Sequence, residues 1–301
     1  MLYKLYKSFL HLSIKIERIS GKIRYLGNVS KIFSIFGEFN TRFRNQIGTI
    51  FLDKPEKTVN VYHKEYSEAE PPAGLLRTER TMDMKKHILC LGDSNTHGYC
   101  ADPADCADGG IRFNEEERWT CLLQKALGPE VLVTEEGLSG RTTVFPDPLH
   151  ESMDALSVLY ALLKSHEFLD LLIIMLGTND TKERLGANAS CIAIGMERLV
   201  RKAQSVDCWG ERGPNILLVC PPPIRPEMEL AECGRPMGRG CVEKSRELPG
   251  YLEKTARLVG AYYLDAAGCE FNTVDGMHLT RRGHAQLAKL LAAEVPGLLA
   301  D

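Results

Sequence analysis

The sequence lacks several features that would place it in a specialised class. Its ten cysteines include no C-x-x-C pair, and the closest pairs, Cys100/Cys106 and Cys233/Cys241, do not have the spacing of zinc ligands. No run approaches the roughly 18 apolar residues that a membrane-spanning helix needs. The net charge of -3 argues against nucleic-acid binding as the role of the whole chain. What remains is an ordinary globular composition in which we expect no metal site and no membrane span.

Several cysteines lie inside apolar runs, where a free thiol packs as a small hydrophobic side chain; they include Cys90, Cys121 and Cys220. Disulfide frameworks belong to small secreted domains, which this pattern does not resemble. We therefore predict free thiols, a reducing compartment and a cytoplasmic location.

Residues 1–81 differ from the rest of the chain. The first 50 residues contain nine basic residues but only two acidic ones, with apolar residues between them. Residues 53–79 are polar and contain three prolines, which is typical of a linker. The segment is either a basic amphipathic element for a membrane surface or partner, or upstream sequence without a function. We predict a basic extension plus linker over 1–81, either poorly ordered or non-catalytic, and one domain over 82–301.

Strand and helix patterns alternate from residue 87 onward. Short apolar runs predict strands at 87–91, 131–134, 169–176, 216–219 and 261–264. Helical periodicity predicts helices at 116–127, 154–164, 189–204, 246–259 and 281–293. This alternation is typical of a parallel sheet that is covered by helices on both faces. Residues 221–244 are too long for an ordinary connection, so we expect a functional loop there.

A turn follows the first predicted strand and contains Ser94. The apolar run over 88–91 stops at Gly92, and the serine comes two residues later. In open parallel sheets, ligands bind outside the carboxyl ends of the strands, where Ser94 would meet a substrate. The alternative is that the serine and Asp93 only cap the next helix.

Polar stretches also follow the other predicted strands, at 136–143, 177–180, 221–223 and 274–278. In a parallel sheet these all share one edge with Ser94, which favours catalysis over capping. Ser94 would be the nucleophile, His278 its base, and Asp275 the carboxylate that orients the imidazole. The amides of Ser94 and Gly140 and the side chain of Asn179 would bind the oxyanion.

Other assignments were compared with these. Ser139 is the rival nucleophile, but it lies in Gly-Leu-Ser-Gly rather than in a Gly-x-Ser-x-Gly elbow. His284 is the rival base, although its position beside a glycine at a helix start favours a solvated or capping role. His97 could be a third catalytic group or a pocket wall. For Asn179, the alternative to binding the oxyanion is that it serves only to form a turn. We expect Asp180 to hold its turn by hydrogen bonds to the backbone.

The sequence resembles the SGNH (GDSL-type) hydrolases, and within them the cytoplasmic arylesterase/acyltransferase group. The resemblance covers about residues 86–295 and none of the first 81. The blocks that carry it are Gly92-Asp93-Ser94-Asn95, Gly140, Gly177-Thr178-Asn179-Asp180 and Asp275-Gly276-Met277-His278. Four blocks in the right order at matching strand ends are far more specific than one.

The resemblance implies a three-layer α/β/α sandwich around a central, mostly five-stranded parallel sheet, which is a flavodoxin-like arrangement. It implies a serine acyl-enzyme that needs neither a metal nor another cofactor, and hydrolysis of small esters. Close relatives transfer acyl groups to alcohols or hydrogen peroxide and assemble as oligomers, so we expect acyl transfer and a homo-oligomer here.

Two departures from the family concern the pocket. Asn95 stands where many members have leucine, and His97 where close relatives have tryptophan, which should make the pocket wider and more polar. We expect the pocket to be lined by His97, Thr178, Phe145 and Met277, with loops at 145–150 and 221–244. The substrate stays open: a carbohydrate O-deacetylase or a lysophospholipase-like thioesterase would use the same triad. A binding module for acylated sugars or anions is the non-enzymatic alternative.

Overall fold

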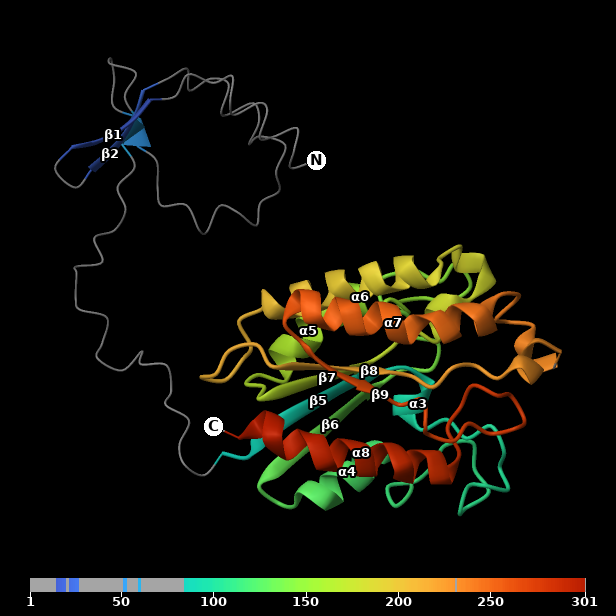
Figure 1. Cartoon of the computed structure of the whole chain (residues 1–301). Coiled ribbons are helices and arrows are strands. Elements are labelled where there is room, and N and C mark those ends of the chain that lie inside the picture. Colours follow the sequence, from blue (N-terminus) through green and yellow to red (C-terminus); the bar gives the residue numbers. More distant parts are fainter. Residues whose placement is uncertain are drawn as a thin grey trace. The chain divides into compact units, whose positions relative to one another are not determined.

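The computed structural model describes residues 15–19, 22–26, 51–52, 59–60, 84–230 and 232–300. The chain divides into two units, Met1–Thr81 and Met82–Asp301 (Figure 1). In the first unit, β1 (Lys15–Ile19) pairs antiparallel with β2 (Lys22–Leu26), and β3 (Phe51–Leu52) pairs antiparallel with β4 (Val59–Asn60). Most of the basic extension and the predicted linker lie outside the described residues.

The second unit is built on one parallel sheet with the strand order β6-β5-β7-β8-β9. Its strands are β5 (Lys86–Gly92), β6 (Val131–Gly137), β7 (Leu171–Met175), β8 (Ile216–Cys220) and β9 (Tyr262–Asp265). Strand β5 pairs with both β6 and β7, so the strand order reverses at β5. Ligands bind at such a reversal in open α/β sheets. All pairs are parallel, so the carboxyl ends of the five strands share one edge.

Helices cover both faces of this sheet (Figure 1). Helices α5 (Ala155–Ser165), α6 (Ala189–Gln204) and α7 (Cys241–Val259) lie on one face, and α4 (Trp119–Leu127) and α8 (Arg281–Leu299) on the other. Successive strand side chains alternate between the two cores: Leu89 packs with the first group of helices and Ile88 with the second. The predicted three-layer α/β/α fold is therefore confirmed.

Helix boundaries show where periodicity was a poor guide. Helix α8 continues to Leu299 instead of ending at residue 293, although it contains Pro296. Val295 and Leu299 are buried in the core below that turn, and this packing outweighs the hydrogen bond that proline removes. Short elements carry too few residues for a period and were not predicted: α3 (Ser94–His97) and the 3-10 turns η2 (Asn179–Thr181), η3 (Glu183–Leu185), η4 (Pro226–Leu230) and η5 (Glu232–Gly234).

Candidate active site

The turn after β5 presents Ser94 at the first residue of α3. The Asp93 carboxylate caps this helix, because its Oδ1 accepts the Asn95 N–H at 2.9 Å. Gly92 allows the sharp reversal: a Cβ there would stand 1.9 Å from the Thr96 Oγ1. The local sequence thus fixes the serine where the strand ends.

Ser94, His278 and Asp275 form one hydrogen-bonded line. The Ser94 Oγ lies 2.8 Å from His278 Nε2, and His278 Nδ1 lies 2.7 Å from Asp275 Oδ2. Burial favours protonation of Asp275, but the hydrogen bond from His278 and those from nearby donors outweigh it and lower the pKa of this carboxyl. The ionised carboxylate therefore accepts the Nδ1–H, which leaves Nε2 free to accept the serine proton.

Asn272 orders the loop that carries this carboxylate and imidazole. Its Nδ2 donates to Asp275 Oδ1 at 3.0 Å and to the His278 carbonyl at 2.8 Å. Its Oδ1 accepts the Val274 and Asp275 N–H groups, each at 2.8 Å. Sequence reasoning missed Asn272; its position three residues before Asp275, suited to an Asx turn, was the available signal.

Asn95 joins the serine turn to the histidine loop. Its Nδ2 donates to the Met277 carbonyl at 3.1 Å, and its Oδ1 accepts the Leu279 N–H at 2.9 Å. Leucine, common in the family at this position, could make neither bond. The departure from the family pattern therefore brings a direct polar link between the two halves of the site.

Two further segments bring hydrogen-bond donors to the same turn. The Leu138 N–H donates to the Gly92 carbonyl at 3.1 Å, which holds the loop after β6, and Gly140 in that loop has a φ of +93°. Asn179 Nδ2 lies 3.4 Å from Asp93 Oδ2. Within the described chain, the Ser94 and Gly140 amides donate to no protein acceptor. They remain available to an anion.

Two buried carboxylates support these turns. Besides capping α3, Asp93 has a pKa raised to about 6 by burial. Asp180 Oδ1 accepts the Thr143 N–H at 2.9 Å and its hydroxyl at 2.6 Å, while its Oδ2 has no partner among the described residues. Burial also raises the pKa of Asp180 to about 6. Both favour the protonated form more than they would in an unfolded chain.

This gives a prediction for Asp180→Asn. In the wild type, the folded state holds this proton to higher pH than the unfolded state, so its contribution to stability is present below about pH 4 and lost as pH rises through about 6. The amide does not titrate, so the variant should gain on the order of 1 kcal/mol relative to wild type between pH 5 and pH 8. Urea unfolding at both pH values measures this. The exposed Asp207→Asn is the control, and an unchanged difference between variant and wild type would contradict the prediction.

The residues predicted to line the pocket lie in different surroundings, and three of them are buried or packed. Thr178 is buried, and its hydroxyl has no partner among the described residues. Phe145 packs against α6, where a Cβ on Gly195 would lie 3.2 Å from its ring. Met277 packs under the long loop with a small cluster that includes Met228. Phe145 and Met277 thus contribute to packing.

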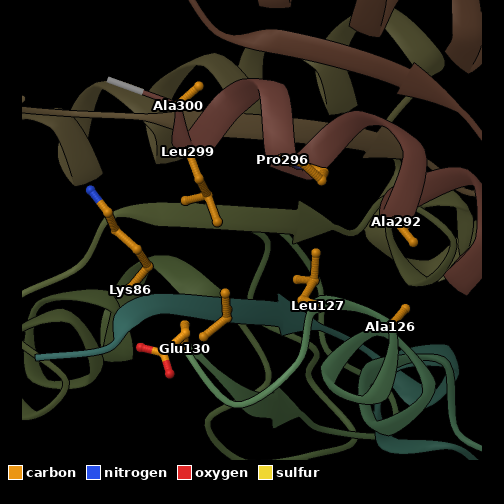
Figure 2. Close-up of a pocket in the computed structure, with 9 residues that line it drawn as sticks. Lys86, Ala126, Leu127, Glu130, Ala292, Pro296, Leu299 and Ala300 are labelled. Atoms are coloured by element: carbon orange, nitrogen blue, oxygen red, sulfur yellow. The ribbon is translucent and has the colours of Figure 1, made fainter.

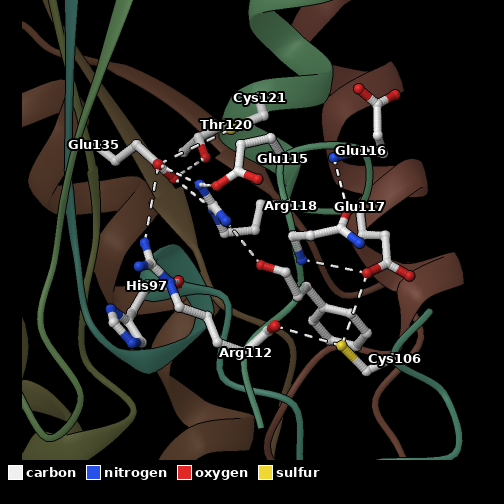
Figure 3. Close-up of polar contacts among 12 residues, drawn as sticks. His97, Cys106, Arg112, Glu115, Glu116, Glu117, Arg118, Thr120, Cys121 and Glu135 are labelled. Carbon is white, nitrogen blue, oxygen red and sulfur yellow. Dashed lines mark hydrogen bonds and ion pairs between the residues drawn. The ribbon is translucent and has the colours of Figure 1, made fainter. Parts of the chain in front are cut away.

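His97 ends α3 beside a polar network (Figure 3). Burial and the neighbouring Arg112 and Arg118 cations lower its pKa, which favours the neutral ring. The carbonyl of His97 accepts the Arg112 Nε–H at 2.9 Å, and Arg118 donates to both Glu135 oxygens at 2.8 and 3.0 Å. This network fixes the segment that starts at Tyr99, whose ring centroid lies 4.6 Å from that of His278. Sequence reasoning missed Tyr99.

The expectation of a solvated His284 was wrong, whereas the capping alternative fits, because the ring accepts the N–H of Trp119, the first residue of α4. The His284 side chain is fully buried, its ring centroid lies 4.9 Å from that of Phe113, and its Nδ1 accepts the Trp119 N–H at 3.2 Å. Burial lowers its pKa to about 3. It is a neutral core residue, because the loop before α4 covers the start of α8.

Two hollows lie on the second unit. One, of about 340 Å³, is lined by α4, α8 and the starts of β5 and β6 (Figure 2), at the opposite edge from Ser94. Its aliphatic walls carry only Lys86 and Glu130 as charged groups. The other, of about 620 Å³, lies between loops that follow strand carboxyl ends. Only this second hollow shares the sheet edge with the serine.

No three His, Cys, Asp or Glu side chains gather into a metal-binding group within the residues described. Likewise, no helix of the described segments has the length and apolar character to cross a membrane.

A five-stranded parallel sheet between two layers of helices is the fold of the SGNH hydrolases, and here a serine, a histidine and a carboxylate lie in line at its carboxyl edge. The chain belongs to the GDSL-like lipase/acylhydrolase family, whose model matches residues 90–286. The family assignment made from the four sequence blocks is confirmed.

Solved structures of esterases resemble this chain. The native aryl esterase of M. smegmatis is 35% identical, with a TM-score of 0.64, over 71% of this chain and 100% of that one. A carbohydrate acetylesterase family member from Sinorhizobium meliloti is also 35% identical, with a TM-score of 0.64, over 71% and 99%. A second carbohydrate acetylesterase from that organism is 33% identical, with a TM-score of 0.64, over 71% and 100%. No curated protein matches the chain.

Proposed function

We propose that this protein is a serine esterase that hydrolyses small aryl or alkyl esters of carboxylic acids through an acyl-enzyme. The observation that carries the proposal is the unbroken hydrogen-bonded line from Ser94 through His278 to Asp275. A nucleophile, a base and a group that orients the base are what acyl transfer from an ester requires.

In the first half-reaction, His278 Nε2 takes the Ser94 proton while the oxygen attacks the ester carbonyl. The negative charge that develops on the carbonyl oxygen is met by the amides of Ser94 and Gly140 and by the Asn179 side chain. His278 then gives its proton to the leaving alcohol, and the acyl group stays on Ser94. In the second half, His278 activates water, and the acid is released.

The substrate assignment has three branches on the same proposed triad: aryl or alkyl esters, acetylated carbohydrates, and lysophospholipids or thioesters. The aryl esterase relative supports the first branch, and the carbohydrate acetylesterase relatives support the second, all at 33–35% identity. The resemblance also supports acyl transfer to an alcohol or hydrogen peroxide in place of water. A lysophospholipase or thioesterase activity is the third branch. A binding module would have no use for the Asp275–His278 pair.

The catalytic assignment concerns residues 82–301, which we propose as the hydrolase domain, with 1–81 outside the chemistry. The family match at 90–286 and the division of the chain at residues 81 and 82 support this. A homo-oligomer and a cytoplasmic location remain predictions.

A panel of p-nitrophenyl esters with increasing acyl length, plus acetylated sugars, tests the function. We expect hydrolysis that is fastest for acetate and, when an alcohol is added, a new ester in the products. A fluorophosphonate should label Ser94. The same assays on a chain that starts at Met82 test the domain assignment. Absence of both turnover and labelling in folded protein would favour the binding module.

A further inference from the structure

The hollow of about 620 Å³ is formed by loops at the carboxyl edge of the sheet, the edge that also carries Ser94. Its lining comes from three segments, at 149–150, 183–184 and 235–238. These follow β6, β7 and β8 respectively, so they rise from the same sheet edge as Ser94. Two of them lie in the loops that the sequence singled out as pocket walls. The hollow is therefore placed to hold a part of an ester bound at the serine.

A buried ion cluster links this hollow to the oxyanion donors. Asp147 is fully buried and accepts from Lys182 Nζ at 3.0 Å and from Arg184 at 2.9 and 2.6 Å. Hydrogen bonds from Arg184 and then Lys182 hold the pKa of Asp147 well below its usual range, against its burial. Lys182 Nζ lies 4.0 Å from where a Cβ on Gly140 would stand. Lys182, a member of the cluster, thus lies next to the loop that carries Gly140.

The charges around the hollow are mostly positive. Arg184 lines it and also donates to the Pro236 carbonyl, which ties two walls together. Arg235 lines it as an exposed side chain with no acidic partner among the described residues. The one acidic side chain in the lining, Glu183, accepts the Arg239 N–H at 3.0 Å. The two positive charges of Lys182 and Arg184 outnumber the single negative charge of Asp147, which contacts both.

We propose that this hollow binds a carboxylate on the substrate, so that the preferred esters carry a negative charge remote from the bond that is cleaved. This refines the proposed esterase function and rests on it. Arg184 is already ordered by Asp147 and the Pro236 carbonyl, so it needs little reorganisation to meet an anion, and the exposed Arg235 supplies the second cation of the lining. On a chain with a net charge of -3, such a site selects anionic esters that the molecule as a whole repels.

Matched ester pairs test the proposal. For charge on the alcohol, 4-acetoxybenzoate is compared with its methyl ester; for charge on the acyl group, p-nitrophenyl hydrogen adipate is compared with p-nitrophenyl methyl adipate, whose chain is too long for easy attack of the carboxylate on its own ester. Each kcat/KM is divided by the rate of hydroxide hydrolysis, which removes intrinsic reactivity. At least one charged ester should be favoured about tenfold at low salt, and about 0.5 M NaCl should reduce this preference. The pair that responds shows which part of the ester enters the hollow.

Variants connect the preference to the site. Arg235→Gln should lower the charged-to-neutral ratio about three- to tenfold, whereas Arg198→Gln, an exposed arginine on α6, should not. If neither pair favours the charged ester, or if Arg235→Gln leaves the ratio unchanged, the proposal is wrong.

A binding measurement separates this proposal from the esterase function. Calorimetric titration of the Ser94→Ala protein with 4-acetoxybenzoate, p-nitrophenyl hydrogen adipate and their methyl esters needs no turnover. If the wild type hydrolyses no ester but one charged compound binds more tightly than its methyl ester, and Arg235→Gln removes the difference, the esterase function fails and the anion site stands. Equal binding within both pairs overturns the anion site.

Discussion

Ser94→Ala is expected to lower kcat/KM for p-nitrophenyl acetate by about 10⁵-fold. The alanine leaves the oxyanion donors and the His278–Asp275 pair in place but removes the atom that forms the acyl-enzyme. Because nucleophile and base act as one unit, loss of the nucleophile removes nearly all that the triad contributes. Release of p-nitrophenol measures the loss, and reaction with a fluorophosphonate should disappear with it.

Ser139→Ala is the matched control for this experiment. Ser139 lies close in sequence to Gly140 but is exposed, and no histidine hydrogen bond to its hydroxyl is found among the described residues. We expect this variant to keep the wild-type rate. A loss in Ser139→Ala together with wild-type rates in Ser94→Ala would transfer the nucleophile to the rival residue.

The meeting of Ser94, His278 and Asp275 could be predicted because parallel strands bring their carboxyl ends together. Ser94 and His278 are separated by 184 residues, yet each follows a strand pattern, and a parallel sheet places all such positions at one edge. The fold was predictable for the same reason, since alternating strand and helix patterns leave few other architectures. For residues at strand ends, the order and direction of the strands are therefore enough to predict which side chains lie close together.

The contacts that tune the site could not be predicted in this way. Asp147 meets Lys182 and Arg184 across loops that have no periodicity, and only the folded path of those loops brings them together. Met277 packs in a cluster with Met228 and Met237 of the long loop, and its place next to His278 in the sequence does not reveal these contacts.

His284 is a residue that local sequence places in solvent but the fold buries. A histidine one turn into a helix beside a glycine is usually solvated, and this helix is amphipathic. However, the segment before α4 crosses the start of α8, and Trp119 there donates its N–H to the imidazole. A covering segment from 165 residues away leaves no local trace in the sequence.

Asp275→Asn should lower kcat by about 10³- to 10⁴-fold. Asp275 Oδ1 already accepts from the Met277 and His278 N–H groups at 3.1 and 3.2 Å and from Asn272, so the asparagine carbonyl is needed there. Its NH₂ must then face His278 Nδ1 and would donate to it. The imidazole is forced into the tautomer that carries its proton on Nε2, and that nitrogen cannot accept the proton of Ser94.

If the wrong imidazole tautomer causes the loss of activity, kcat and stability should respond differently, which an unfolded loop would not give. The Asp275→Asn loop keeps its backbone hydrogen bonds, so the melting temperature should fall little while kcat collapses. KM for p-nitrophenyl acetate should change by less than about threefold, because the carboxylate does not touch the ester. Asp265→Asn, an exposed carboxylate at the end of β9, is the control and should keep the wild-type kcat. If Asp275→Asn instead retains most of its kcat, the carboxylate only shapes the loop, and His278 must be oriented by its other neighbours, Tyr99 and Asn272.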